Sequence, residues 1–159
     1  MANLTELSIE MSKLKKQIET LLRISKYREH DDLSGLGDSA QPKTADQLQQ
    51  LEEYRRALDK LDEVQYRLEY LEMPIREASR IYRNETGRYE TDHGHYYTSG
   101  SSIEFLRTEE VYNDNSGKWE DSEIWTRSTV ESKDGEYYIV GYPDIELSGL
   151  KVRVRRVGK

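Results

Sequence analysis

Residues 44–83 read TADQLQQLEEYRRALDKLDEVQYRLEYLEMPIREASRIYR. Apolar side chains recur through this segment at alternating spacings of three and four residues, which is typical of one long amphipathic helix whose seam needs a partner helix. Thr44 and Gln47 match a capping box at its start. Pro74 predicts a kink, or a break followed at once by a new helix. We therefore expect helical structure from about residue 44 to residue 83.

A second helix is predicted ahead of this segment, over residues 3–30. Its apolar residues keep the three-and-four alternation for three heptads, and Asn3 with Glu6 can cap its start. Residues 31–43 contain two glycines and a proline and are predicted to form a loop. Because the two helices have similar lengths, we expect an antiparallel coiled-coil hairpin that forms the first domain, residues 1–84.

The hairpin is also predicted to form a homodimer. Two helices bury only one stripe each, whereas two hairpins make a four-helix bundle with a closed core. Whether the helices pair within one chain or between chains stays open at this point. The leucines expected at the dimer contact lie on the apolar seams of both helices, and they are Leu7, Leu14, Leu21, Leu51, Leu58, Leu61 and Leu68.

After Gly87 the hydrophobic period changes from helical to two, and tyrosines and β-branched residues multiply. Asp134-Gly135 predicts a tight hairpin turn, and Asn115-Ser116-Gly117 a longer one. Short antiparallel strands can hardly bury a core as an open sheet, so we predict a small closed barrel over residues 85–159 and an α+β fold. The expected strands are 87–91, 95–98, 102–107, 119–131, 136–142 and 151–157.

Composition excludes several classes of protein. No run of 18 apolar residues is present, and the first residues lack the basic and apolar blocks of a signal peptide, so we expect a cytoplasmic protein without a membrane span. The absence of cysteine excludes disulfides, thiol catalysis and cysteine-based zinc sites. A net charge of −7 argues against nucleic-acid binding by the whole surface.

The C-terminal part carries a set of motifs that ends in a leucine-glycine-leucine turn followed by a basic and valine-rich strand. The motifs are Gly87-Arg88-Tyr89, Gly100 before Ile103-Glu104-Phe105-Leu106, Trp119, Tyr137-Tyr138-Ile139-Val140 and Leu147-Ser148-Gly149-Leu150-Lys151-Val152-Arg153-Val154. With them, this part resembles a small uncharacterised bacterial domain family that is common in Gram-positive bacteria and their mobile elements. The resemblance implies a compact β domain and a phage or mobile-element context. It implies no catalytic residue.

Catalytic and metal-binding residues are not expected. His93 and His95 beside Asp92 could bind a metal ion, but His30 is the only other histidine and no cysteine is present to complete the shell. We interpret this segment as a solvated hairpin turn. The same histidines are the only bases for a serine nucleophile, and Ser99–Ser102 has the composition of a turn. We therefore predict no enzyme activity, no metal and no cofactor.

Charge and aromatic residues are concentrated in the β part. Residues 86–150 hold five Lys or Arg against 14 Asp or Glu, whereas residues 151–159 hold five basic residues and no acidic one. Adjacent tyrosines in a strand point to opposite faces, so some rings face outward, either as packing pairs or as a recognition surface. The predicted partner contact combines aromatic anchors with surrounding carboxylates. It consists of Tyr96, Tyr97, Tyr112, Trp125, Glu109, Glu110, Asp114, Glu120, Asp121 and Glu123.

These features predict a non-enzymatic binding or adaptor protein that oligomerises through its hairpin and contacts a basic protein partner through its β domain. Two alternatives stay open. The first is an anti-CRISPR-like inhibitor of a host nuclease or defence protein, suggested by the size, the acidity and the resemblance. The second is a nucleic-acid accessory factor that uses the basic end of the chain, namely Lys151, Arg153, Arg155 and Arg156.

Overall fold

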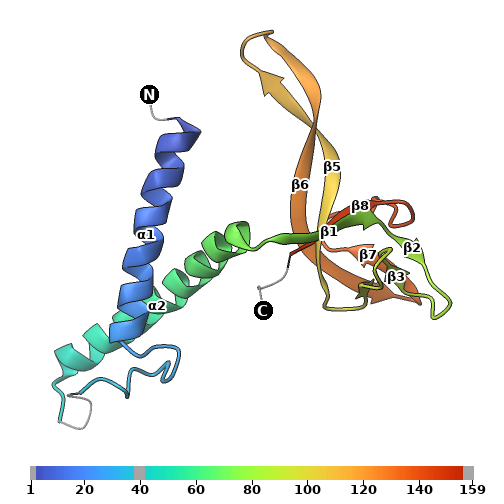
Figure 1. Ribbon diagram of the computed structural model, residues 1–159. Helices are drawn as coiled ribbons and strands as arrows, with labels where there is room; N and C mark the ends of the chain where they lie inside the picture. Colours follow the sequence, from blue (N-terminus) through green and yellow to red (C-terminus); the bar gives the residue numbers. More distant parts are fainter. Residues whose placement is uncertain (1–2, 38–41, 156–159) are drawn as a thin grey trace. The chain divides into compact units, whose positions relative to one another are not determined.

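The computed structural model describes residues 3–37 and 42–155, and the chain divides into two compact units between Glu72 and Met73. Within the described residues, two helices are followed by strands in antiparallel pairs (Figure 1), which confirms the predicted α+β class. The elements are α1 Leu4–Ile24, α2 Ala45–Glu72, β1 Ile75–Arg80, β2 Tyr82–Arg83, β3 Tyr89–Glu90, β4 Tyr96–Tyr97, β5 Ser102–Asn113, β6 Lys118–Lys133, β7 Glu136–Ile139 and β8 Lys151–Arg155.

Both helices of the first unit begin at the predicted capping boxes. At the start of α1, the amide of Glu6 donates to Asn3 Oδ1 at 3.0 Å, and Glu6 accepts a hydrogen bond from the Asn3 amide in return. Thr44 and Gln47 form the same reciprocal pair at the start of α2. Within the described residues, neither helix combines the length and the apolar character that crossing a membrane requires.

The helices run in opposite directions, because Lys15 pairs with Glu72 whereas Arg28 pairs with Asp62. They cross instead of lying side by side along their whole length (Figure 1), so the predicted coiled-coil packing is not confirmed. The buried core of this unit joins Ile18 and Leu22 of α1 to Leu58 of α2. The loop after α1, predicted only as a connector, adds the buried Leu33 to the same core.

The leucines predicted at the dimer contact fall into different environments. Leu58 is only 7% exposed, so it is unavailable to a second chain and that prediction is corrected. The other three predicted leucines of α2 are half-buried. Leu7, Leu14 and Leu21 are 54%, 38% and 43% exposed, and their seven-residue spacing leaves a leucine stripe along α1.

The prediction of helix beyond Pro74 is wrong. The segment Ile75–Arg80 is β1, which pairs antiparallel with β8, and it is followed by the short strand β2. Pro74 lacks an amide donor and disfavours helical geometry at the preceding residue, so α2 ends at Glu72. Because this segment belongs to the sheet, the units divide at Glu72 and not at the predicted position, residues 84–87.

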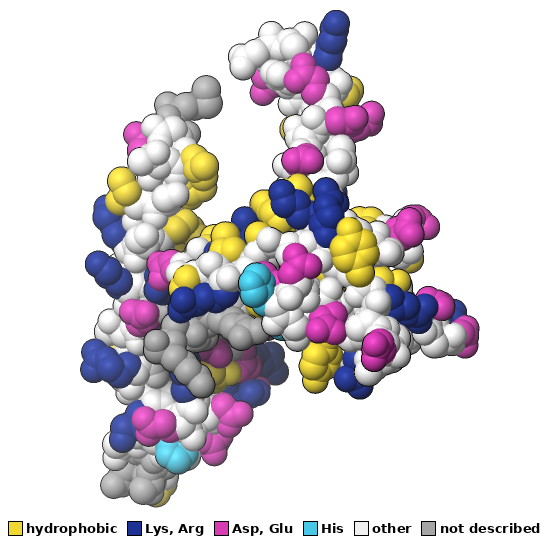
Figure 2. Space-filling model, turned by 45° about the vertical axis from the view of Figure 1, so that its right-hand side comes forward, with side chains coloured by type: hydrophobic (Ala, Val, Ile, Leu, Met, Phe, Trp, Pro, Cys, Tyr) yellow, Lys and Arg dark blue, Asp and Glu magenta, His cyan; other side chains and the backbone are white. Residues whose placement is uncertain are grey.

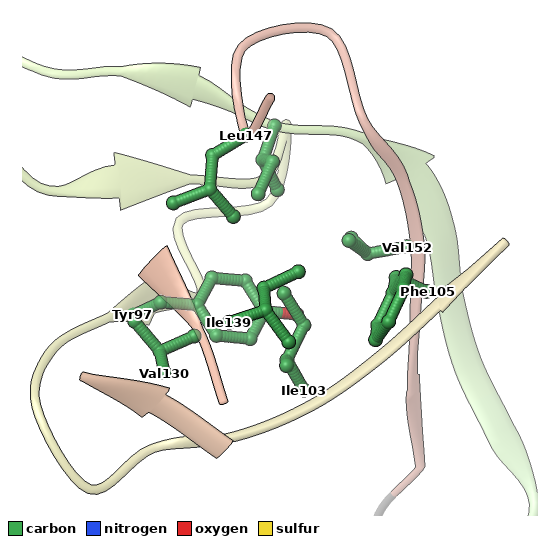
Figure 3. Close-up of a cluster of buried hydrophobic side chains, with 8 residues drawn as sticks. Tyr97, Ile103, Phe105, Val130, Ile139, Leu147 and Val152 are labelled. Carbon is green, nitrogen blue, oxygen red and sulfur yellow. The ribbon is translucent and has the colours of Figure 1, made fainter. Parts of the chain in front are cut away.

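The second unit contains an open five-stranded sheet in the order β1-β8-β5-β6-β7 and a three-stranded sheet in the order β2-β3-β4. No closed barrel is found among the described strands, because β1 and β7 do not pair with each other. Residues of both sheets and of the connecting loops share one apolar core (Figure 3), which explains how an open sheet is stabilised. Its buried members are Ile81, Tyr97, Ile103, Phe105, Val130, Ile139, Leu147 and Val152.

The position of β1 leads to a prediction about fragments of the chain. A fragment from Met73 should fold alone, because it keeps β1 and the Met73 carbonyl that Arg155 Nη1 contacts at 3.0 Å. A fragment from Asn84 should be much less stable, since it lacks β1 and the fully buried Ile81, and losing such a side chain typically costs about 2–5 kcal/mol. Circular dichroism during thermal unfolding compares the two. Equal melting temperatures, or disorder in the longer fragment, would contradict the boundary.

Candidate protein-docking arm

The candidate site is a two-stranded arm, which we define as residues 107–124. Strands β5 and β6 pair in an unbroken register from Ser102↔Thr129 to Asn113↔Lys118. By contrast, β8 pairs with β5 only at Glu104 and Phe105. Beyond that point β5 and β6 continue as a ribbon away from the sheet (Figure 1).

The tip of the arm is held by hydrogen bonds within the turn. Asn113 Oδ1 accepts from the amide of Asn115 at 2.9 Å, and Gly117 has the positive φ of 67° that such a turn requires. Glu120 accepts from Asn113 Nδ2 at 2.9 Å and from Ser116 Oγ at 2.7 Å. These hydrogen bonds, from Asn113 first and then Ser116, hold the pKa of Glu120 below its ordinary value. Glu120 therefore stabilises the turn.

The register divides the arm's side chains between two faces. Residues directly opposite each other share a face, so Tyr112 lies with Trp119, and Glu110 lies with Asp121. Period-two alternation along β6 adds Glu123 to the same side. We call this set, Tyr112, Trp119, Glu110, Asp121 and Glu123, the aromatic-acidic face.

Within the described residues, Glu110, Asp121 and Glu123 form no ion pair, although Glu123 lines a pocket together with Arg80, Arg107 and Lys151. The acidic pair Glu110 and Asp121 stands directly opposite across the ribbon. On the other face, Glu109 is paired with Arg107 at 3.0 Å. Figure 2 shows several acidic side chains along the arm.

The aromatic pair at the tip is exposed to solvent. Trp119 is 67% exposed and Tyr112 is 48% exposed, and their ring centroids lie 5.6 Å apart in an edge-to-face arrangement. Trp119 was not among the residues that the sequence predicted to contact a partner. The Asn115-Ser116-Gly117 turn carried the signal, because the hairpin that it closes places Trp119 opposite Tyr112.

The remaining residues of the predicted partner contact lie in different parts of the β unit. Tyr97 is only 2% exposed in the core, so it cannot contact a partner and this prediction is wrong. Tyr96 is 51% exposed, but it lies on β4 beneath the Arg88 guanidinium. Trp125 lies at the base of the arm and is half-buried, with the Arg153 guanidinium 4.3 Å from its ring centroid. Asp114 lies in the turn at the tip.

The basic end of the chain is engaged in the sheet. Arg153 and Arg155 both donate to Glu104, whose side chain is only 6% exposed, and their own side chains are 19% and 9% exposed. Lys151 is exposed at the start of β8. Arg156, the other residue predicted to contact nucleic acid, lies outside the described residues. Two of the three described cations are therefore held by a carboxylate.

The histidine segment considered as a metal site contacts one buried carboxylate. Glu77 of β1, with a side chain 7% exposed, accepts from the His93 amide and from Ser79 Oγ at 3.1 and 3.0 Å, and His93 Nδ1 lies 3.1 Å from it. Burial raises the pKa of this carboxyl, but hydrogen bonds from Thr91, His93 and Ser79 outweigh burial and lower the pKa to about 2. Among the described residues, no group of three or more metal-ligating side chains comes together.

Comparison with known proteins matches one part of the chain. Residues 78–154 match the sequence model of a family described as a domain of unknown function, DUF5348. The match begins within β1 and ends within β8, so it covers nearly all of the sheet structure and leaves out the helices. No curated protein and no solved structure matches the chain. The expected uncharacterised domain in the C-terminal part is thus confirmed, whereas its bacterial and mobile-element context stays a prediction.

Glu77 generates a prediction about pH. Its pKa is about 2 in the folded chain against 4.5 ordinarily, so the carboxylate contributes stability above pH 4.5, and that contribution disappears as the pH falls towards 2. Glu77→Gln should lower the free energy of unfolding at pH 7 by about 1–3 kcal/mol, the cost of disturbing a buried hydrogen-bonded group. Urea unfolding followed by tryptophan fluorescence reports on the β unit, where both tryptophans lie.

The difference between wild type and Glu77→Gln should narrow progressively between pH 4.5 and pH 2. Asp92→Asn provides the control, because Asp92 is exposed in the same turn. A wild-type advantage that stays constant across this pH range would show that the charge of Glu77 is not its source.

Proposed function

We propose that the protein is a non-enzymatic binding module that docks a basic partner protein on the aromatic-acidic face of its arm and oligomerises through its helical unit. The observation that carries the docking proposal is the uncompensated acidic pair formed by Glu110 and Asp121. Like charges directly opposite across a ribbon are destabilising, by an amount on the order of 0.2–1 kcal/mol. The cations of a basic partner would neutralise this repulsion and would themselves be attracted to both carboxylates.

The exposed aromatic pair complements the charge. Tyrosine and tryptophan supply much of the binding energy in protein interfaces, because they bury a large area and lose little conformational entropy. Trp119 and Tyr112 already contact each other, so the pair is partly ordered before binding. Lysine and arginine side chains on a partner could also stack on these rings while they approach the carboxylates.

The arm favours the inhibitor alternative over the nucleic-acid alternative. A surface that binds nucleic acid is basic, and an acidic ribbon complements such a surface on a nuclease or another defence protein. The accessory-factor alternative relies on cations of β8, of which Arg153 and Arg155 are paired with Glu104. The phage or mobile-element context implied by the resemblance agrees with an inhibitor.

Oligomerisation through the helices is supported by apolar surface in the first unit. A groove of about 580 Å³ lies between the end of α1 and the middle of α2, and Leu21, Ile24, Tyr54 and Leu61 are among its lining residues. Leu21 belongs both to this groove and to the leucine stripe, so the two apolar surfaces adjoin. Large exposed apolar patches commonly mark contact sites. A second hairpin would cover it in a four-helix arrangement.

Reversing the acidic charges of the aromatic-acidic face tests the docking proposal. The triple variant Glu110→Lys, Asp121→Lys and Glu123→Lys should reduce the association rate with a basic protein such as cytochrome c by about tenfold or more at low salt, since complementary charge acts mainly on the association rate. The salt dependence of association should flatten at the same time. Stopped-flow tryptophan fluorescence measures both quantities.

A matched variant controls for the change in net charge. Glu85, Asp92 and Asp144 are exposed carboxylates of the same unit outside the arm, so their reversal to lysine alters the net charge equally. The control should retain an association rate close to that of the wild type. If the two triple variants slow association equally, net charge governs binding and the arm is not the docking site.

The dimer is tested by mass and by point substitution. Light scattering at micromolar concentration should give twice the chain mass of 18.7 kDa. Replacing Leu14 and Leu21 by lysine should give monomers that keep their helical content, because both side chains are exposed within one chain. By comparison, Ile18→Ala should lower helix stability, since Ile18 is buried in the core of one chain. A wild-type chain that stays monomeric would overturn the oligomerisation proposal.

A further inference from the structure

We propose that the outer edge of β6 in the arm binds an extended basic segment of a partner protein as an additional β-strand. This inference rests on the proposed function, because it specifies how the arm would hold a basic partner. Strand addition supplies affinity through main-chain hydrogen bonds and specificity through alternate side chains.

Backbone hydrogen bonds at the base of β6 show which groups point to its outer edge. The Val130 amide donates to the Ser101 carbonyl and the Val130 carbonyl accepts from the Gly100 amide, both at 2.8 Å, so Val130 faces the β5 side. The neighbouring Thr129 carbonyl accepts from Val140 at 2.9 Å, on the β7 side. Because these directions alternate in antiparallel strands, odd-numbered residues of β6 point their N–H and C=O groups away from β5.

The outer edge of β6 has no strand beside it in the arm. Strand β7 pairs with β6 only from Val130 to Lys133. In the part of the chain that the structure describes, β5 and β7 are the only strands that pair with β6. The backbone groups of Trp119, Asp121 and Glu123 are therefore positioned to pair with an incoming strand.

The usual obstacles to edge pairing are also missing from this edge. Proteins protect exposed edges with prolines, bulges, short strands or charges. Strand β6 spans 16 residues, its register with β5 is unbroken over the whole arm, and neither strand contains proline. Charge is the protection that remains, and here it is acidic.

The charge selects the occupant. Trp119, Asp121 and Glu123 alternate along one face, and side chains of an added strand would lie about 4.5–5.5 Å from them. Lysine or arginine at alternate positions would meet both carboxylates, with an apolar stem or ring near Trp119. A second copy of the arm would instead bring carboxylates close to carboxylates. The edge thus fits a basic strand of another protein and disfavours self-pairing.

The first test uses the full-length chain and a synthetic decapeptide in which lysine alternates with threonine. On binding, amide hydrogen exchange measured by NMR should slow at least tenfold at Asp121 and Glu123, whose N–H groups point outward. Exchange at Ser122 and Ile124 should stay unchanged, because the N–H groups of even-numbered residues of β6 point toward β5. Equal changes at odd and even positions would overturn strand addition.

A second peptide separates this inference from the proposed function. It has the same sequence and charge, but every second backbone nitrogen is methylated, which removes the donors on one edge. Strand addition predicts binding at least tenfold weaker than that of the unmodified peptide. Equal binding of both peptides would leave the basic-partner proposal intact and overturn strand addition, whereas binding of neither would overturn both. The same measurement without peptide tests self-pairing. If exchange at the odd positions then slows further as the protein concentration rises, the occupant of the edge is a second copy of the chain, which would overturn the proposal.

Substitutions at Asp121 provide a matched pair on the protein. Asp121→Pro and Asp121→Asn remove the same charge, but only proline removes the outward N–H, and proline is tolerated on an edge strand whose N–H faces solvent. Affinity for the unmodified peptide should fall roughly tenfold further in Asp121→Pro than in Asp121→Asn. Circular dichroism should show that both variants keep the fold. Identical affinities would mean that the β6 backbone takes no part.

Discussion

The ion pairs from Glu104 to Arg153 and Arg155 are the interaction on which the sheet depends most, because they join the last strand of the described chain to its central hairpin. Among the described strands, β8 lies between β1 and β5, so β1 is hydrogen-bonded to the five-stranded sheet only through β8. Without it the core would also lose the buried Val152. A buried carboxylate that loses its paired cations typically costs several kcal/mol. The ion pairs of Glu104 therefore strongly favour the observed strand order.

Elements that are encoded by a few neighbouring residues could be predicted from the sequence. The prediction failed where pairing with a distant strand determines the secondary structure. The capping boxes and the Asp134-Gly135 turn are encoded within a few residues, and each is present. The change of hydrophobic period was predicted after Gly87, whereas strand structure already begins at Ile75. In residues 75–83 the apolar residues fit a helical spacing, yet the buried Glu77 and Ile81 fit a strand equally well. The choice is made by β8, about 75 residues away, whose pairing no local pattern reveals.

The candidate site was predictable in composition but not in geometry. Acidic residues and aromatic rings identified residues 109–125 as unusual, and much of that set lies on the arm. Alternation required Tyr96 and Tyr97 to face opposite ways, but it could not show that Tyr97 is the buried one. Trp119 was overlooked because its exposure depends on β5 and β6 continuing past the sheet, which follows from the short pairing between β8 and β5.

The arm's carboxylates have two physical consequences that cannot be separated. A long, regular ribbon with unpaired edges and an exposed tryptophan would tend to pair with copies of itself, and like charge opposes that association. The same charge attracts basic strands, so protection from self-association and preference for a basic partner arise from one set of side chains. If protection alone were required, the Glu110 and Asp121 pair would be unnecessary, because lysine at one of these positions would remove the cross-strand repulsion and still keep the edge charged. A like-charge pair beside exposed aromatic rings therefore favours recognition as the reason for this arrangement.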